Sequence, residues 1–202
     1  MEEKNMTTIN KAVSLRIPAR AKRIQKTHRT EKNAMSTANY TTISMGKPIT
    51  TPVLIPVEHK STPAFINNQL VINGNIYGVT ALSLGSPHGA VIVDDVDSAD
   101  VPVLGAALGT HVLFPKGANI VFIQVLDKES IKVRLWQRGA GEVQFAGESV
   151  AVAGIAAMML QKVLSSDVKV SVGGTVFLVK WNRGRDEVTL TGPSELLTRH
   201  AN

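Results

Sequence analysis

Short apolar segments separated by turn residues run through most of the chain. Three pairs of such segments each flank a turn: 69–72 and 76–80 around Asn73-Gly74-Asn75, 120–126 and 131–136 around 127–130, and 168–172 and 176–181 around Gly173-Gly174. Asn and Gly tolerate the positive φ angles that tight hairpin turns require. The pattern therefore predicts three β-hairpins, with further strands at 90–93 and 187–191.

Two segments have helical character. The first runs from Asp100 to Leu108, with Ser98 or Asp100 as the cap and Pro102 in the first turn, where its missing N–H does no harm. The second runs from Ser149 to Leu164 and carries no charge as far as Leu160. An all-apolar helix is buried on every side, so we expect strands around it.

The small residues of the second helix strengthen this expectation. They are Ala151, Ala153, Gly154, Ala156 and Ala157. Because small side chains let neighbouring backbones approach, the composition is typical of a helix enclosed by a curled sheet.

Charge is distributed unevenly along the chain. The 202 residues are 44% hydrophobic, which is enough for a sizeable core, but residues 1–40 carry nine Lys or Arg against three Glu. The remaining 13 basic and 13 acidic residues cancel. We interpret residues 1–40 as a basic, disordered leader; contact with phosphates, a transit peptide and a replacement for a lost upstream lobe stay open as alternatives. No aromatic residue precedes Tyr40, so base recognition and a nucleic-acid partner are not supported.

Several classes of protein are disfavoured. The chain has no cysteine, which excludes disulfides and thiolate metal sites and is compatible with the cytoplasm. The longest apolar run, Val150–Leu160, is shorter than the roughly 20 residues that span a bilayer. The histidines show no metal-ligand spacing, so we predict no metal site; they are His28, His59, His88, His111 and His200.

A set of motifs resembles one protein family. Gln137-Arg138-Gly139-Ala140-Gly141-Glu142, followed by Ala146-Gly147-Glu148, resembles a Glu-Arg-Gly-Ala-Gly-Glu run that leads to a cysteine, a glycine and a small hydroxyl residue in the diaminopimelate epimerases. Four further segments match in family order: 41–48 (Met-Gly-x-Pro), 81–88 (Ser-Met-Gly-Asn-Pro-His), 114–120 (Phe-Pro-x-x-x-Asn-Val) and 190–193 (Thr-Gly-Pro). The resemblance covers about residues 41–195, the family's second, C-terminal lobe, and leaves 196–202 as a tail. The first-lobe motifs Gly-Asn-Asp-Phe and Cys-Gly-Asn-Gly do not occur in the sequence.

The resemblance implies a fold and a chemistry. The fold is α+β, a single lobe in which a curled, mostly antiparallel sheet surrounds a central buried helix. These epimerases use no cofactor: two cysteines, one from each lobe, remove and return the α-proton, and the helix start holds the carboxylate at the reacting carbon. The corresponding position here is Gly147 with the amides that follow it.

The chain departs from this pattern where the chemistry occurs. Ala146 stands at the cysteine position and cannot exchange a proton. Glu148 replaces the small hydroxyl residue, so we expect it to repel a carboxylate. Gln137 stands where the family has an acidic partner, and Ser86 where an asparagine contacts the distal end of the substrate.

Two matched residues keep the family's polar groups. By resemblance, Asn119 and Arg138 hold the distal amino-acid end of an amino-dicarboxylate. A structural role is also open for each: an ion pair of Arg138 with Glu142 or Glu148, and a strand-end role for Asn119. The neighbouring motif residues have structural interpretations as well: His88 as a satisfied loop residue, Glu142 as an acceptor for loop amides, and backbone conformation as the reason for Gly139, Gly141 and Gly147.

Two functions remain as hypotheses. The sequence favours a noncatalytic epimerase-like lobe that binds a partner, either another copy of itself or an intact epimerase. The alternative is an enzyme that interconverts LL- and meso-diaminopimelate in lysine biosynthesis, which would need both acid/base groups from elsewhere.

Overall fold

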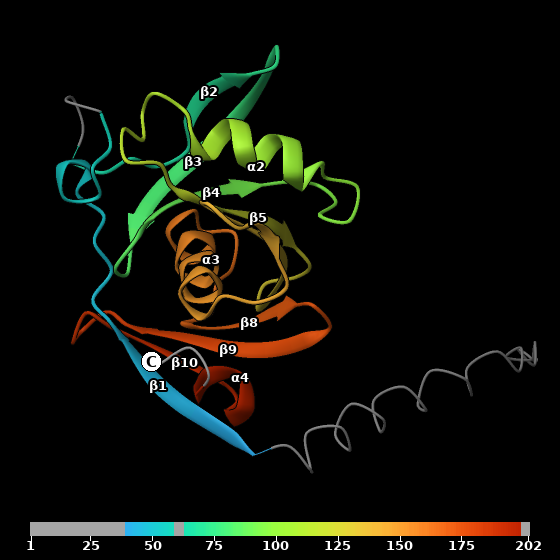
Figure 1. Cartoon of the computed structure of the whole chain (residues 1–202). Helices are drawn as coiled ribbons and strands as arrows, with labels where there is room; N and C mark the ends of the chain where they lie inside the picture. Colours follow the sequence, from blue (N-terminus) through green and yellow to red (C-terminus); the bar gives the residue numbers. More distant parts are fainter. Residues whose placement is uncertain (1–38, 59–62, 199–202) are drawn as a thin grey trace, which may run out of the picture. The chain divides into compact units, whose positions relative to one another are not determined.

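The computed structural model describes residues 39–58 and 63–198 of the chain (Figure 1). Most of the predicted basic leader and the last residues of the predicted tail lie outside this part, as do His28, His59 and His200.

One mixed sheet organises the described residues. Its strands are β1 (Tyr40–Gly46), β2 (Asn68–Ile72), β3 (Asn75–Ser83), β4 (Pro87–Ile92), β5 (Asn119–Val125), β6 (Ser130–Gln137), β7 (Gly141–Val143), β8 (Asp167–Val172), β9 (Thr175–Asn182) and β10 (Glu187–Pro193). The strand order is β1-β10-β9-β8-β6-β5-β4-β3-β2, with β7 paired to β6 off this path. The β4–β5 and β6–β8 ladders are parallel and the other ladders between these strands are antiparallel, so the sheet is mixed. The three predicted hairpins are confirmed, at β2–β3, β5–β6 and β8–β9.

The sheet curls until its two halves meet at one point. Just after β1, Ile49 forms an antiparallel bridge with Ser83 at the end of β3. The two backbone hydrogen bonds measure 2.8 Å from Ile49 N–H to Ser83 O and 2.9 Å from Ser83 N–H to Ile49 O. This bridge joins the β1 side of the sheet to the β3 side.

The helix α3 (Gly147–Met159) lies inside the curl, as the sequence predicted. Figure 1 shows it between β3, β4 and β5 on one side and β8, β9 and β10 on the other. Residues 149–158 are all buried. Gly154 allows the closest approach, because a Cβ built there would lie 2.8 Å from Cβ and Cγ1 of Val179 in β9.

This helix ends earlier than predicted. The sequence indicated an end near Leu164, whereas α3 ends at Met159. Gln161 has a φ of 54°, and the amides of Gln161 and Lys162 bond to the carbonyls of Met158 (3.2 Å) and Ala157 (2.9 Å). This is the Schellman pattern, which usually has glycine at the left-handed position. Gln161 gave no such signal in the sequence.

The outer face of the sheet carries a second core. The helix α2 (Val101–Gly109) is capped by Asp100, whose side chain accepts a hydrogen bond from Val103 N–H at 3.3 Å; Asp100 is one of the two predicted caps. Trp136 of β6 packs under α2, and a Cβ built on Gly105 would lie 2.4 Å from its ring. The sheet thus separates an inner core around α3 from an outer core under α2.

Two short helical segments complete the described residues. The 3-10 turn η1 spans Pro52–Leu54, and α4 spans Ser194–Thr198. Leu197 of α4 is buried in the inner core, inside the segment that the sequence assigned to the tail. In the described part of the chain, every helix is too short or too polar to cross a membrane.

Candidate functional site

The candidate site is the start of α3. Ala146 is its N-cap residue, with extended backbone (φ −152°, ψ 112°) and 5% of its surface exposed, and it offers no side-chain cap. The first amides of a helix have no intrahelical acceptor, and the helix dipole favours an anion beside them. The cysteine position of the motif therefore lies at an anion-attracting helix start and holds a methyl group.

The carboxylate of Glu148 is bound by the loop between β3 and β4. Its Oε1 accepts the backbone N–H of Ser86 at 2.5 Å, and its Oε2 accepts the Ser86 hydroxyl at 3.2 Å. Gly85, with a φ of 147°, gives the loop the backbone conformation that turns Ser86 toward the helix. Ser86 was predicted as a ligand for the far end of a substrate; in this structure it holds the protein's own carboxylate.

A buried histidine lies next to this contact. His88 is fully buried in β4; its Nδ1 lies 2.9 Å from the Ser86 carbonyl and its Nε2 lies 2.9 Å from the Ser149 hydroxyl. A carbonyl oxygen can only accept, so Nδ1 carries the proton and Nε2 accepts from Ser149. Burial lowers the pKa of His88, against the opposing effects of Glu148 and the Ser86 carbonyl. His88 is thus a satisfied, neutral histidine, as its structural interpretation predicted, although it lies in a strand.

Asn119 and Arg138 lie together at the far end of this group. Asn119 is the first residue of β5; its Oδ1 accepts Arg138 N–H at 3.0 Å, and its Nδ2 lies 3.4 Å from His88 Nε2. This is the strand-end role predicted as an alternative for Asn119. The Arg138 guanidinium donates to the Lys116 carbonyl.

The predicted ion pairs of Arg138 are absent among the described residues. Glu148 binds Ser86, and Glu142 binds Arg134 through bonds of 2.7 Å to Nε and 3.0 Å to Nη2. This also corrects the prediction that Glu142 accepts loop amides. The bidentate contact with Glu142 is the main cause of the raised pKa of Arg134.

Sequence reasoning did not find the role of Arg134. Its Nη1 donates to the carbonyls of Val96 (3.0 Å) and Ala99 (2.8 Å), which fastens the segment before α2 to β6. In the sequence, Arg134 stands at an outward-facing position of a strand with alternating apolar and polar residues. Such a position usually indicates a side chain exposed to solvent, so no sign of these contacts is visible in the sequence.

The turn between β6 and β7 explains two of the predicted glycines. Gln137 ends β6, and Gly139 and Gly141 have φ angles of 81° and 78°. Gly147 has no such φ, and a Cβ there would meet its nearest neighbours at an ordinary 3.6 Å. The conformational interpretation of Gly147 is therefore wrong.

Four of the predicted site residues are connected by one chain of contacts, with His88 as a link; Gln137 and Gly147 are not part of it. It passes through Glu148, Ser86, His88, Asn119 and Arg138 in that order. Each step is a hydrogen bond or a polar contact of 3.4 Å or less. The helix start and the residues matched to the distal end of a substrate thus form a single internal network.

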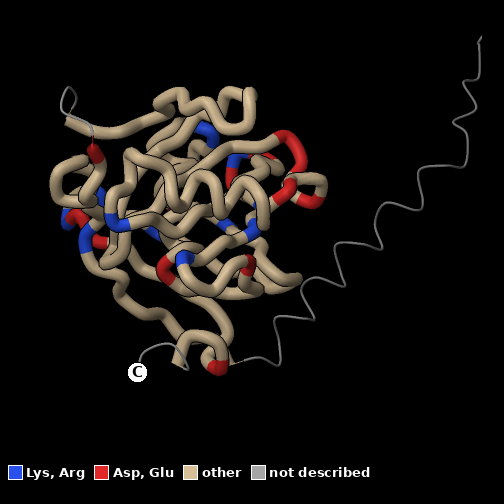
Figure 2. Tube along the Cα trace, turned by 45° about the horizontal axis from the view of Figure 1, so that its top comes forward, with Lys and Arg blue, Asp and Glu red and all other residues tan. Residues whose placement is uncertain are grey.

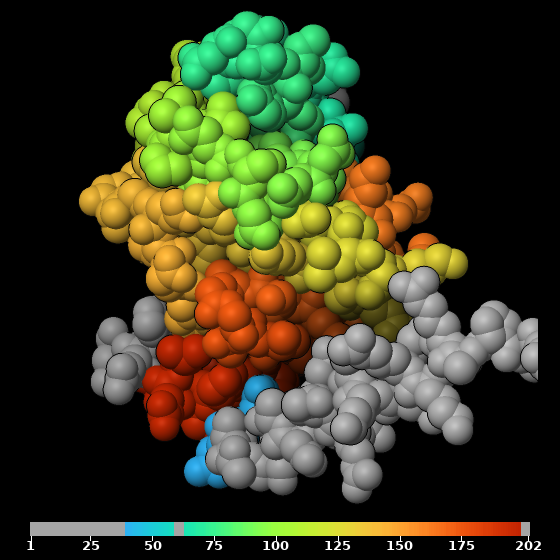
Figure 3. Space-filling model, turned by 90° about the vertical axis from the view of Figure 1, so that its right-hand side faces the viewer, coloured from blue at the N-terminus to red at the C-terminus, as the bar shows by residue number. Residues whose placement is uncertain are grey.

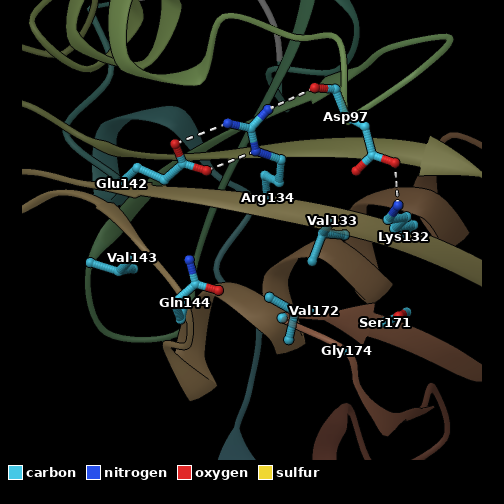
Figure 4. A pocket seen from close by; sticks show the side chains of 11 residues that line it. Asp97, Lys132, Val133, Arg134, Glu142, Val143, Gln144, Ser171, Val172 and Gly174 are labelled. Carbon is cyan, nitrogen blue, oxygen red and sulfur yellow. Dashed lines mark hydrogen bonds and ion pairs between the residues drawn. The ribbon is translucent and has the colours of Figure 1, made fainter.

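A cavity of about 250 Å³ lies elsewhere, where β6 separates from β8 (Figure 4). Two ion pairs line it, Arg134–Glu142 and Lys132–Asp97. The predicted substrate-binding residues are not among its lining residues. Across residues 39–58 and 63–198, His, Asp and Glu side chains form no cluster that could hold a metal ion.

Comparison with known proteins agrees with the motifs. The sequence pattern of the family described as diaminopimelate epimerase matches residues 80–197. Diaminopimelate epimerases of Bacillus cereus (strain ATCC 10987 / NRS 248) and Bacillus anthracis are 34% and 33% identical over 158 residues. The match covers 78% of this chain and 54% of each relative, so the chain spans about half the length of these enzymes.

Solved structures show the same fold at low sequence identity. A probable proline racemase from Agrobacterium radiobacter K84, with bound carbonate, has a TM-score of 0.53 at 12% identity, covering 76% of this chain and 50% of its own. A hydroxyproline epimerase from Agrobacterium vitis has a TM-score of 0.51 at 13% identity, covering 77% and 50%. These likenesses show the fold alone, whereas the sequence match over residues 80–197 shows the family: this chain belongs to the diaminopimelate epimerase family.

Proposed function

We propose that this chain is a noncatalytic member of its family that serves as a binding or scaffold subunit. Proton exchange at an α-carbon needs a group that titrates at the reacting carbon. Ala146 supplies none, and the sequence contains no cysteine to replace it. The neighbouring His88 is buried, and both of its ring nitrogens are engaged.

The observation that carries this proposal is the contact of Glu148 with Ser86. An incoming carboxylate at the start of α3 would meet a carboxylate already hydrogen-bonded there. Two unit charges about 4 Å apart repel by about 1 to 4 kcal/mol, depending on the local dielectric. We therefore expect the helix start to reject free amino acids.

Two measurements on the full chain test this proposal. Calorimetric titration with diaminopimelate should show no binding, and incubation in D₂O should show no deuterium incorporation at its α-carbon. Deuterium exchange above a buffer blank refutes the proposal that the chain is noncatalytic. Binding without exchange refutes only the expectation that Glu148 keeps amino acids from the start of α3.

A variant with a matched control tests the role of Glu148. Glu148→Thr restores a small hydroxyl residue, removes the repelling charge and should allow diaminopimelate to bind, still without exchange. Glu195→Thr is the matched control, because Glu195 is also a glutamate in the first turn of a helix but is exposed. If the two variants behave alike, Glu148 does not control access.

The alternative function is epimerisation of diaminopimelate in lysine biosynthesis. The proximity of Asn119 and Arg138 favours it, because these residues match those that hold the distal end of the substrate. It requires acid/base groups supplied by another subunit. Deuterium exchange that appears only after an intact epimerase is added, above the rate of that epimerase alone, would support this function and identify the partner.

We also propose a cytoplasmic location, from the absence of cysteine and the family's metabolic role. The expected partners remain another copy of the chain or an intact epimerase subunit.

A further inference from the structure

The strand β2 is an unprotected edge of the sheet. It is the last strand of the sheet order, and among residues 39–58 and 63–198 it pairs only with β3. Its ladder with β3 is regular from Asn68 to Ile72, with no bulge, and β2 contains no proline. Such an edge presents a row of backbone donors and acceptors that can pair with another strand.

The opposite edge of the sheet is protected. The strand β1 has a register shift between Ser44 and Gly46, and Lys47 and Pro48 follow it. Bulges, lysines and prolines are devices that natural proteins use to prevent edge pairing. The β1 edge of the sheet therefore carries such devices, whereas β2 contains none of these three.

The stretch of sequence that contains β2 carries no Lys, Arg, Asp or Glu, and large apolar side chains are exposed on it. Residues 61–93 contain no Lys, Arg, Asp or Glu, so the whole described part of this stretch is tan in Figure 2. Val71 and Ile76, directly opposite each other in the β2–β3 hairpin, are 66% and 65% exposed. In the space-filling view the hairpin, coloured teal, forms one end of the lobe (Figure 3).

The turn geometry shows which backbone groups face outward. Asn73 and Gly74 have φ angles of 50° and 79°, as a type I′ turn requires, so Ile72 and Asn75 form the hydrogen-bonded pair that closes the hairpin. Bonded and non-bonded pairs alternate along an antiparallel ladder. The backbone groups of Gln69 and Val71 therefore point away from β3.

We propose that β2 pairs with β2 of a second copy of this chain, antiparallel and with Leu70 on the two-fold axis. Gln69 then lies opposite the partner's Val71, and Val71 lies opposite the partner's Gln69. Each of these pairs exchanges two backbone hydrogen bonds. A strand paired with itself in this way is self-complementary, and the uncharged hairpins bring no like charges together. This inference concerns assembly and holds whether or not the helix start binds an amino acid.

The first test is the mass of the full chain by sedimentation equilibrium over a range of concentrations. We expect it to rise from 21.6 kDa toward twice that value. A monomer at all concentrations overturns the proposal.

The second test uses the absence of cysteine from the sequence. In the proposed register, Gln69→Cys on one copy lies opposite Val71→Cys on the other, at the separation of about 5.5 Å that suits a disulfide. Like positions are diagonal, about 7 to 8 Å apart, which is too far. Oxidation of the mixed single variants should give a disulfide-linked dimer, and oxidation of either alone should not. A dimer without this pattern overturns the register.

A pair of substitutions separates edge pairing from packing of the exposed face. Val71→Pro removes the outward N–H in both copies and should weaken dimerisation by at least about tenfold. Ile76→Lys changes the same exposed face but leaves the edge intact, and should not. If Ile76→Lys alone disrupts the dimer, the interface is the face and the proposal is wrong. If Val71→Pro does not fold, the mixed-cysteine result decides.

Discussion

Replacing Ser149 by alanine tests the internal network at its most buried point. Ser149 is 1% exposed, and its hydroxyl donates to Nε2 of the fully buried His88 at 2.9 Å. Without this donor, Nε2 keeps only the long 3.4 Å contact with Asn119. A buried polar group left without a proper partner costs about 1 to 3 kcal/mol.

A second effect opposes the first. Alanine favours a helix over serine by up to about 0.5 kcal/mol, which reduces the loss. The hydrogen bond is the larger effect, so we expect Ser149→Ala to lower the free energy of unfolding by about 0.5 to 2.5 kcal/mol. For a domain of this size, that corresponds to a fall in Tm of roughly 1 to 10 °C.

Urea unfolding followed by circular dichroism measures this change. Ser171→Ala is the matched control, because Ser171 is only partly buried in β8; its effect should stay within about 0.5 kcal/mol. A double-mutant cycle with His88→Leu should give a coupling of about 0.5 kcal/mol or more. If Ser149→Ala is as stable as the parent chain, or the coupling is zero, the network does not stabilise the helix start.

Three further predictions follow from single contacts. Burial lowers the pKa of His88 from its ordinary 6.5, so as the pH falls the unfolded chain binds a proton at this residue before the folded chain does. The free energy of unfolding should therefore be highest above pH 6.5 and decrease below it, by up to about 1.4 kcal/mol per pH unit. The variant His88→Asn should show a smaller decrease. Gly154→Ala gains about 1 kcal/mol of helix propensity, but it places a Cβ 2.8 Å from the buried Val179, which costs about 1 to 3 kcal/mol. We therefore expect urea unfolding to show a less stable protein. A more stable variant would contradict the tight packing of α3 against β9. Glu142→Gln should lower the free energy of unfolding by about 1 kcal/mol, because it weakens the contact with Arg134. In 0.5 M NaCl the difference in free energy between the variant and the parent chain should decrease, because salt screens the charges. If the difference is the same in salt, the charge of Glu142 is not the cause.

The parts of the fold that local patterns determine were predictable from sequence. The β2–β3 hairpin follows from two apolar segments around Asn73-Gly74-Asn75, and the burial of α3 follows from its lack of charge. The bridge between Ile49 and Ser83 was not predictable, because a single long-range pair leaves no periodicity. The end of α3 was missed because a non-glycine residue takes the left-handed position.

The candidate site shows a similar division. The motif located Ala146 and Glu148, because both adjoin Gly147, which the motif contains. The contact of Glu148 with Ser86 joins residues 62 positions apart, and no spacing rule indicates it. The ion pair predicted for Arg138 failed for the same reason: Glu142 was nearest in sequence, but the strand pairing of β6 with β7 brings it to Arg134.

In the part of the chain that the structure describes, the hydrogen bonding at the helix start leaves no buried polar side chain near Ala146 without a partner. A buried polar group without a partner costs about 1 to 3 kcal/mol. Among the described residues, every buried side-chain nitrogen and oxygen has a partner. Glu148 and Ser149, which follow shortly after Ala146, bind Ser86 and His88 respectively, so both tie α3 to the β3–β4 segment. The polar side chains that follow Ala146 therefore have hydrogen-bond partners within the chain, and these contacts hold the start of α3 against the sheet without a side-chain hydrogen bond at the cap position.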